Sequence, residues 1–306
     1  MCTAINFNGS YHLFGRTLDN ECEYGEEPCI VPQDAARTLG YRSISHAENK
    51  VLGMASRIGG APYFFDGLND KGLCVAGLNL PVSTRLSDKA SAPDTIPSQE
   101  LVYHLLATAS TTDDVRCILK DKSVTSDPPA PNIPSPTLHY LITDSKGAIT
   151  VEITAAGINV YDNPVGVLTN EPTFPYHTDN LLQYSTLSPS TNDGRSHHTA
   201  GLGAIGLPGD FTSASRFVRA AFLAKNATDH KSSEEAVANA FTILGAISIP
   251  EGAVITPRGF MSTRYTAVLD PTAGTYYLRR ADSLTTVSVS INESEGLDKP
   301  KFIRSF

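Results

Sequence analysis

Alternating apolar and polar residues open the chain and predict a β-hairpin. Residues 3–7 and 11–16 each alternate in this way and include aromatic side chains. Between them stands Asn8-Gly9, a dipeptide that readily adopts the positive φ values of a tight two-residue turn. Because an N-terminus that belongs to a strand is held in place, we expect the first residues to be positioned rather than frayed.

The same alternation recurs beside turn-forming residues and predicts further strands. Asn, Asp, Pro and Gly gather at residues 69–72, 144–147 and 271–274, where we expect turns. The strands expected beside turns or directly after them cover residues 73–78, 138–143, 148–154, 158–161, 263–269 and 275–280.

Apolar residues three and four positions apart predict helices in two regions. The expected helices cover residues 98–109, about 115–119, 213–225 and 233–244. Ser98, which follows a proline, is expected to cap the first of them. Residues 126–136, rich in Pro and Ser, are expected to form an extended surface loop. The order of strands, helices, strands, helices and strands predicts an α+β fold with antiparallel sheets rather than regular β-α-β alternation.

The length and net charge of the chain indicate the number of domains and the kinds of partner to expect. The chain has 306 residues and no obvious linker, so we expect a single domain over residues 1–306. It carries 32 Asp and Glu against 24 Lys and Arg, a net charge of −8, and no run of basic residues. A nucleic-acid partner is therefore not expected, because binding phosphates requires a basic surface.

The chain shows no feature of a membrane or secreted protein. Its longest weakly polar stretch, residues 241–250, is far shorter than the roughly 20 residues of a membrane helix. The opening residues lack the basic and apolar regions of a signal peptide, so we expect Met1 to be the true start and the protein to be cytoplasmic. Five cysteines, an odd number at wide spacing, indicate reduced thiols rather than a disulfide framework.

Cys2 is the first candidate for chemistry. Removal of Met1 would leave a residue that bears both a thiol and a free α-amine. Because these groups titrate near pH 8.5 and 7.7–8.0 in peptides, they can share one proton and present a thiolate near neutrality. N-terminal nucleophiles use this arrangement. Taken alone, however, Cys2 is more simply a small residue that follows the initiator.

Polar residues near the predicted strand ends provide candidate partners for this thiol. Across the hairpin, Arg16 and Asp19 can approach the terminus, although a surface ion pair is the simpler interpretation of both. Asn79 and Asn170 each follow an apolar segment, where a carboxamide can donate to a developing oxyanion. For either Asn alone, a role in a turn is favoured. Arg216 lies in a predicted helix after glycine-rich turn residues, which by itself indicates only a capped amphipathic helix.

Taken together, these segments resemble the choloylglycine hydrolase family. The opening MCT, GRTLD up to Asp19, AGLN up to Asn79, LTNEPTF around Asn170, and GLPGD with SRFVRAAF around Arg216 stand in the family's order. They run from residue 2 to residue 222 and form a highly specific set. The family contains conjugated bile acid hydrolases and penicillin V acylases with the N-terminal nucleophile hydrolase fold. The resemblance therefore implies an αββα sandwich and, by analogy, a homo-oligomer, a tetramer.

The resemblance also implies a nucleophile and its partners. Cys2, exposed by loss of Met1, would attack an amide carbonyl, and its own amine would relay the proton. Arg16 would lie beside the thiol and tune it, and Asp19 would bind the α-amine. These roles agree with the chemistry, because a cationic neighbour lowers a thiol pKa and an anchored amine can act as base and then as acid.

Three further residues would complete the site by the same matching. Asn79 and Asn170 would shape the oxyanion site, and Arg216 would support the network. The implied reaction proceeds by acylation of the thiol, release of the amine and hydrolysis of the thioester, and requires no cofactor.

The acyl group is harder to assign than the mechanism. Asn79 in AGLN resembles the bile-acid branch, whereas penicillin V acylases often have Tyr there; Thr17 in GRT is also seen on the penicillin side. Leu18 and Phe65 are candidates for contact with a steroid, although ordinary core packing explains them equally well. We therefore expect a small-molecule substrate, a glycine- or taurine-conjugated bile acid. The alternatives are penicillin V or another N-acyl compound such as an acyl homoserine lactone, and a non-catalytic bile-acid-binding relative.

Other chemistries find little support in the sequence. Cys22 and Cys29 do not have the spacing of a strong zinc pattern, and no second cysteine pair follows, so no metal is expected. His197-His198 stands among polar residues and indicates solvated surface rather than a catalytic base. The chain contains no glycine motif of a nucleotide-binding loop.

Overall fold

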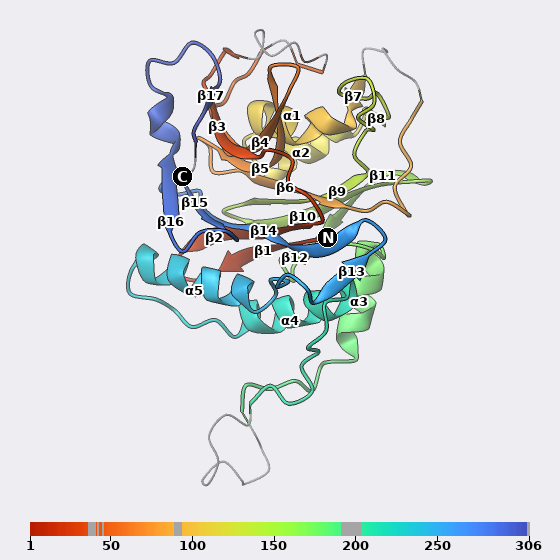
Figure 1. Cartoon of the computed structure of the whole chain (residues 1–306), viewed down its shortest axis with the longest axis vertical. Helices are drawn as coiled ribbons and strands as arrows, with labels where there is room; N and C mark the ends of the chain where they lie inside the picture. Colours follow the sequence, from red (N-terminus) through yellow and green to blue (C-terminus); the bar gives the residue numbers. More distant parts are fainter. Residues whose placement is uncertain (36–40, 42, 45, 89–93, 191–202, 305–306) are drawn as a thin grey trace.

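Two antiparallel sheets lie face to face in the computed structural model, with helices on both outer faces (Figure 1). The structure describes residues 1–304 except 36–40, 42, 45, 89–93 and 191–202. The α+β class and the implied αββα order of layers are confirmed. Helices α1 and α2 cover one sheet, and α3, α4 and α5 cover the other (Figure 1).

The first sheet contains the predicted N-terminal hairpin. Its order is β12-β1-β2-β14-β15-β16, and β13 pairs with β14. In the hairpin Cys2 lies opposite Leu18, and Asn8 lies opposite His12. The strands of this sheet are β1 Cys2–Asn8, β2 His12–Asn20, β12 Val167–Leu168, β13 Val254–Thr256, β14 Gly259–Asp270, β15 Thr275–Arg280 and β16 Thr286–Ser290.

The second sheet contains four strands that the sequence pattern does not predict, β3, β4, β5 and the two-residue β17. Its order is β11-β10-β9-β6-β5-β4-β3-β17. Strands β3, β4 and β5 are buried at most positions, because one face meets the first sheet and the other meets helices or loops, so apolar and polar residues do not alternate there. The strands are β3 Glu27–Val31, β4 Val51–Ile58, β5 Ala61–Asn69, β6 Cys74–Asn79, β9 Leu138–Asp144, β10 Gly147–Thr154, β11 Gly157–Asp162 and β17 Lys301–Phe302.

The helices agree with the predicted regions, with one correction and one addition. Ser98 does not cap α1: it begins a short 3₁₀ turn, and its hydroxyl donates to the Pro136 carbonyl at 2.5 Å. Helix α3 is the addition: it is not among the predicted helices, although Pro175 near its start is a sequence signal, and its first N–H donates to Glu152 on another element. The helices are α1 Leu101–Thr108, α2 Thr112–Leu119, α3 Phe174–Leu182, α4 Ser213–Lys225, α5 Ser233–Gly245, and the 3₁₀ segments η2 Ser98–Glu100 and η4 Ile291–Ser294.

Three smaller observations complete the fold. Strands β7 Thr95–Pro97 and β8 Ser123–Thr125 form a short parallel pair apart from the large sheets. Residues 126–137 contain only an isolated bridge between Ala130 and Ile133, which agrees with the predicted loop. Among the described residues, no helix is both long enough and apolar enough to cross a membrane.

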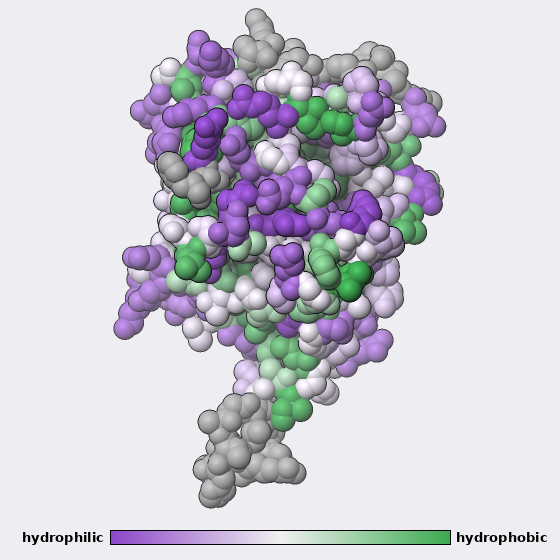
Figure 2. All heavy atoms as spheres, viewed as in Figure 1, coloured by the Kyte–Doolittle hydropathy of each residue, from purple (hydrophilic) through white to green (hydrophobic). Residues whose placement is uncertain are grey.

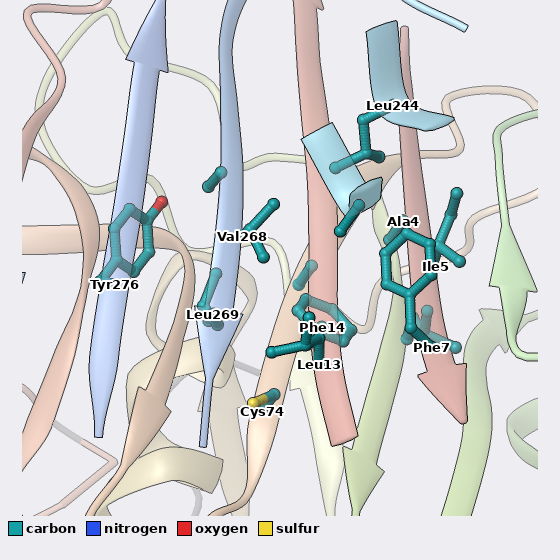
Figure 3. Close-up of a cluster of buried hydrophobic side chains, with 14 of the residues drawn as sticks. Ala4, Ile5, Phe7, Leu13, Phe14, Cys74, Leu244, Val268, Leu269 and Tyr276 are labelled. Atoms are coloured by element: carbon teal, nitrogen blue, oxygen red, sulfur yellow. The ribbon is translucent and has the colours of Figure 1, made fainter. Parts of the chain in front are cut away.

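A continuous apolar core holds the first hairpin in place. Leu13 and Phe14 of β2 lie beside Leu269 of β14, and Leu244 of α5 covers the same region (Figure 3). Each of these side chains is at most 1% exposed. A second apolar cluster lies between the other sheet and α1. Cys2, Ala4 and Ile5 of β1 belong to the first cluster with Leu13 and Phe14, so the whole hairpin is anchored by apolar packing.

Candidate active site

Cys2 and Arg16 meet on one face of the first hairpin. Cys2 is the first residue of β1 and lies opposite Leu18, while Arg16 lies opposite Ala4. Since side chains on a strand alternate between faces, these four side chains share a face. The buried Arg16 Nη2 donates to the Cys2 Sγ at 3.1 Å. The predicted contact between thiol and guanidinium is therefore present.

Asp66 on β5 holds the Arg16 guanidinium from the opposite sheet. Its Oδ2 accepts from Arg16 Nη1 at 3.0 Å, and both side chains are fully buried. Burial by itself lowers the pKa of Arg16, but the acidic groups around it outweigh burial and raise that pKa above its ordinary value. Arg16 therefore remains charged beside the thiol. Sequence reasoning missed Asp66; an acidic residue inside the apolar segment PYFFDGL was the available signal.

Two tyrosine hydroxyls complete the bonds to Asp66. Tyr265 and Tyr276 each donate to one of its carboxylate oxygens at 2.6 Å. Burial, and after it the nearby Asp66 charge, raises the pKa of both tyrosines well above the ordinary value, so their hydroxyls stay protonated as donors. Neither tyrosine is distinguishable from core residues in the sequence. Their role depends on the stacking of the two sheets.

Asp19 lies next to the N-terminus with one oxygen unpartnered. Its Oδ1 accepts from the Thr263 hydroxyl at 2.6 Å, whereas Oδ2 is buried without a hydrogen-bond partner among the described residues. Met1 continues the strand: its ammonium donates to the Asp19 backbone carbonyl at 2.6 Å, and its own carbonyl accepts from the Asp19 N–H at 2.8 Å. With Met1 present, the Asp19 carboxylate is not bonded to an amine. A buried carboxylate oxygen in this position is suited to bind a new ammonium group.

Asn170 and Arg216 close the site around the Cys2 backbone. The Asn170 Oδ1 accepts from the Cys2 N–H and from Arg216 Nη2, each at 2.8 Å. Arg216, which begins the second turn of α4, also donates from Nη1 to the Cys2 carbonyl and the Thr3 hydroxyl, each at 2.6 Å. Burial lowers the pKa of this fully buried arginine. Both predicted residues therefore contact the predicted nucleophile residue directly.

Asn79 joins the site through its backbone. Its carbonyl accepts from the Asn170 Nδ2 at 2.8 Å. Its side chain is exposed at the end of β6 and makes no hydrogen bond with the described residues. The Asn79 carboxamide is thus available to a ligand, while its carbonyl fixes the orientation of the Asn170 carboxamide.

The two candidates for substrate contact lie in different surroundings. Leu18 is 5% exposed and belongs to the core between the sheets. Phe65 is half-buried, its carbonyl accepts from Arg16 at 3.2 Å, and its ring stacks on Tyr24 with centroids 5.7 Å apart. Tyr24 is itself half-exposed. An aromatic surface is therefore available near the Arg16 end of the site.

The arrangement combines a thiol, a permanent cation and amide groups at one strand end, which suits attack on a carbonyl carbon. Among the described residues, no group of three or more His, Cys, Asp or Glu side chains could hold a metal ion. The predicted surface pair His197-His198 lies outside the described residues.

Known proteins resemble this chain along nearly its whole length. A model of the linear amide C–N hydrolases, choloylglycine hydrolase family, matches residues 2–304. A bile salt hydrolase/transferase of Lactiplantibacillus plantarum is 33% identical, with 99% of this chain and 96% of that protein covered. A conjugated bile acid hydrolase of Lactobacillus acidophilus is 31% identical, with 96% of each covered.

Solved structures share the fold. A variant of conjugated bile acid hydrolase from Clostridium perfringens superposes with a TM-score of 0.89 at 32% identity, covering 100% of this chain and 97% of that one. Penicillin V acylase from Agrobacterium tumefaciens has a TM-score of 0.77 at 20% identity, covering 95% of this chain and 87% of that one, and shows likeness of fold alone.

Proposed function

Since the chain belongs to the choloylglycine hydrolase family of linear amide C–N hydrolases, we propose that it is a bile salt hydrolase, which cleaves the amide bond of glycine- or taurine-conjugated bile acids. The observation that carries the proposal is the Cys2 thiol held 3.1 Å from the buried guanidinium of Arg16. The relatives named for bile salts or conjugated bile acids cover almost the entire chain at about one-third identity, which supports the choice of substrate.

Removal of Met1 prepares the nucleophile. The Cys2 nitrogen then becomes an α-amine, which remains within reach of the Asn170 Oδ1 that binds it as an amide at 2.8 Å. The unpartnered Asp19 Oδ2 supplies a negative partner for the ammonium form. An amine held in this way can take a proton from the thiol and later deliver it to a leaving nitrogen.

The reaction proceeds in two balanced steps. In the first, the Cys2 sulfur forms a bond to the substrate carbonyl carbon, the C–N bond breaks, and the amine carries a proton to the departing glycine or taurine nitrogen. In the second, water attacks the thioester, the C–S bond breaks, and the proton of that water returns to the thiol. Carboxamide N–H groups of Asn79 and Asn170 stabilise the oxyanion in both steps. The steps use only this chain's residues and water.

Two features bear on the acyl group. Asn79, rather than a tyrosine, ends β6 and leaves its exposed carboxamide free for a ligand. The stacked rings of Tyr24 and Phe65 offer an apolar face against which a steroid can pack. Penicillin V or another N-acyl amide or acyl homoserine lactone is the alternative within the same mechanism, and a binding protein without turnover is the alternative from another class.

The experiment measures the intact mass of the purified protein and then the hydrolysis of glycocholate, taurocholate and penicillin V under the same conditions. We expect loss of Met1 and faster release of glycine or taurine than of the penicillin side chain. Replacing Cys2→Ala should lower kcat by roughly 10³-fold or more, because the nucleophile is lost. Cys117→Ser, which changes an exposed thiol on α2, should leave kcat unchanged.

The outcomes separate the alternatives. Faster turnover of penicillin V would move the protein to the acylase branch. Inactivity on all three compounds despite a free Cys2 would point to another N-acyl substrate. Undiminished hydrolysis by Cys2→Ala would contradict the proposed mechanism altogether, and binding of bile acid without turnover would identify a binding protein.

The same proposal includes a homotetramer in the cytoplasm. Residues 183–190 and 203–212 project away from the helical layer, where the Ala204 N–H donates to the Ser188 carbonyl at 2.8 Å (Figure 1). Apolar side chains gather on this projection and beside it (Figure 2): Ile205 on the projection and Leu182 at the adjoining end of α3 are each 72% exposed. Exposed apolar side chains on a projecting segment favour burial against another copy of the chain.

A further inference from the structure

Two buried histidines hold two successive carbonyls next to the active site. The Nε2 of His139 lies 2.8 Å from the Thr169 carbonyl oxygen, and the Nε2 of His177 lies 2.8 Å from the Asn170 carbonyl oxygen. Both imidazole side chains are completely buried. A carbonyl oxygen can only accept, so each histidine must carry a hydrogen on Nε2. The backbone on both sides of the Asn170 Cα is therefore tied to a separate element of the fold.

Glu152 connects these two histidines. It lies opposite His139 in the β9–β10 pair, and its Oε1 is 3.0 Å from the His139 Nδ1, with both side chains fully buried. The same oxygen accepts from the Phe174 N–H at 2.8 Å. Phe174 is the first residue of α3, and the Thr173 side chain at its N-cap makes no capping bond. One carboxyl group thus fixes the His139 ring and the N-terminus of the helix that carries His177.

His177 extends the connection to α4. Its ring stacks on Phe217 with centroids 4.9 Å apart and an interplanar angle of 14°. Phe217 follows Arg216, which donates to the Asn170 Oδ1. Burial lowers the pKa of His177, which agrees with a neutral ring whose proton stays on Nε2. The ring therefore contacts Asn170 by a hydrogen bond and packs on Phe217, the neighbour of Arg216 on α4.

We propose that Glu152, His139 and His177 are positioning residues, which set the place of the Asn170 carboxamide relative to Cys2. The inference rests on the proposed function, since it assigns Asn170 a part in that reaction. None of the three side chains contacts the thiol. Their effect reaches the reaction only through Asn170, whose Oδ1 must remain 2.8 Å from the Cys2 nitrogen. Displacement of a reacting group by about 1 Å can cost roughly 10²-fold in rate.

The kinetic test uses substitutions that keep or remove single hydrogen bonds. Glu152→Gln keeps an oxygen that can accept from the Phe174 N–H but removes the negative charge that faces the His139 Nδ1. His177→Leu removes the donor to the Asn170 carbonyl. In both we expect kcat to fall by about 10- to 100-fold while KM changes by less than about threefold. His177→Gln keeps a side-chain N–H and should recover most of the kcat lost in His177→Leu.

A matched control separates positioning from loss of a buried ring. His104 on α1 is also buried, and burial lowers its pKa to about 4, but its neighbours Tyr103 and Leu105 belong to the other apolar cluster. His104→Gln should lower the melting temperature without lowering kcat. The inference is overturned if His104→Gln lowers kcat as much as His177→Leu, if His177→Gln is as slow as His177→Leu, or if Glu152→Gln keeps the wild-type kcat.

A second readout does not require turnover. The side-chain amide resonances of Asn170, assigned by their loss in Asn170→Asp, should shift in Glu152→Gln and His177→Leu and remain in place in His104→Gln. Unmoved resonances in both site variants overturn the inference even if the enzyme is active. If the wild-type protein hydrolyses no conjugate, the proposed function fails, and these resonances still decide whether the three residues position Asn170.

Discussion

Asp66 shows how one residue links the charge of the site to the stability of the molecule. It accepts three hydrogen bonds, from Arg16, Tyr265 and Tyr276, and is fully buried. A buried carboxylate is tolerated only when its charge is paired and its oxygens are bonded. The same bonds hold the guanidinium that contacts the Cys2 thiol, so stability and reactivity depend on one side chain.

Replacement of Asp66→Asn tests this dependence. The variant removes the negative charge and leaves Arg16 as an uncompensated buried cation, so we expect the free energy of unfolding to fall by about 3 kcal/mol. A displaced guanidinium should also lower kcat/KM by roughly 10²-fold. Urea denaturation and conjugate hydrolysis measure the two effects. Asp179→Asn, at an exposed position on α3, should change neither quantity; an unchanged stability in Asp66→Asn would refute the account.

At the level of elements, the alternation of side chains along the strands and the position of the helix N-termini place the polar groups of the site. The β1–β2 register puts Cys2 and Arg16 on one face, and the N-terminal end of α4 brings Arg216 to the same strand end. Thr212 caps α4 by accepting from the Ser215 N–H at 3.3 Å. Asp210 precedes it, accepting from the Ser215 hydroxyl at 2.6 Å and the Thr212 N–H at 2.9 Å. The GLPGD segment thus supports the helix that carries the arginine.

The pH dependence of α4 follows from these bonds. Hydrogen bonds from Ser215 and then Thr212 lower the pKa of Asp210 from 3.8 to about 2. Because the folded pKa is depressed, the stabilisation is present above the ordinary value and is lost as the pH falls from about 4 towards 2. At pH 6, Asp210→Asn should be less stable than the wild type by about 0.5 kcal/mol. Urea unfolding at pH 6, 4 and 3 should show this gap closing; a gap that widens in acid would contradict the assignment.

At the scale of the whole molecule, the stacking of two sheets and the helices on their outer faces buries the charged groups of the site. Arg16 and Arg216 are both fully buried, although they lie on different layers. Arg16 is paired with Asp66, because an unpaired charge between the sheets would be costly. Arg216 donates to neutral acceptors of Cys2, Thr3 and Asn170. Residues 183–190 and 203–212, between α3 and α4, extend away from this packing (Figure 1).

Assembly through that projection has a direct test. Sedimentation equilibrium should give the mass of a tetramer of 32.7 kDa chains. Replacing Leu182 and Ile205 together by Ser should reduce the mass, because the apolar contact is lost. Ile255→Ser is the matched control, since this residue is 75% exposed on β13, outside the projection. A wild-type monomer, or equal dissociation of the control, would remove the proposed interface.

Several parts of the fold are predictable from local pattern. The N-terminal hairpin, the β9–β10 hairpin and helices α4 and α5 agree with the predicted segments, because each shows alternation or helical spacing with clear turn residues. Strands β4 and β5 were not predicted, since burial on both faces removes the alternation. The sequence predicts Ser98 as a helix cap because the pattern does not distinguish a 3₁₀ turn from the first turn of α1.

The sequence by itself determined which residues could take part: the motifs name Cys2, Arg16, Asn170 and Arg216, and the period of the strand places the first two on one face. Only the tertiary structure decided which groups bind them. Asp66 reaches Arg16 from the opposite sheet, and Arg216 contacts Cys2 across 214 positions of the chain. Such partners depend on how layers stack, and a local pattern carries no information about contacts so distant in sequence.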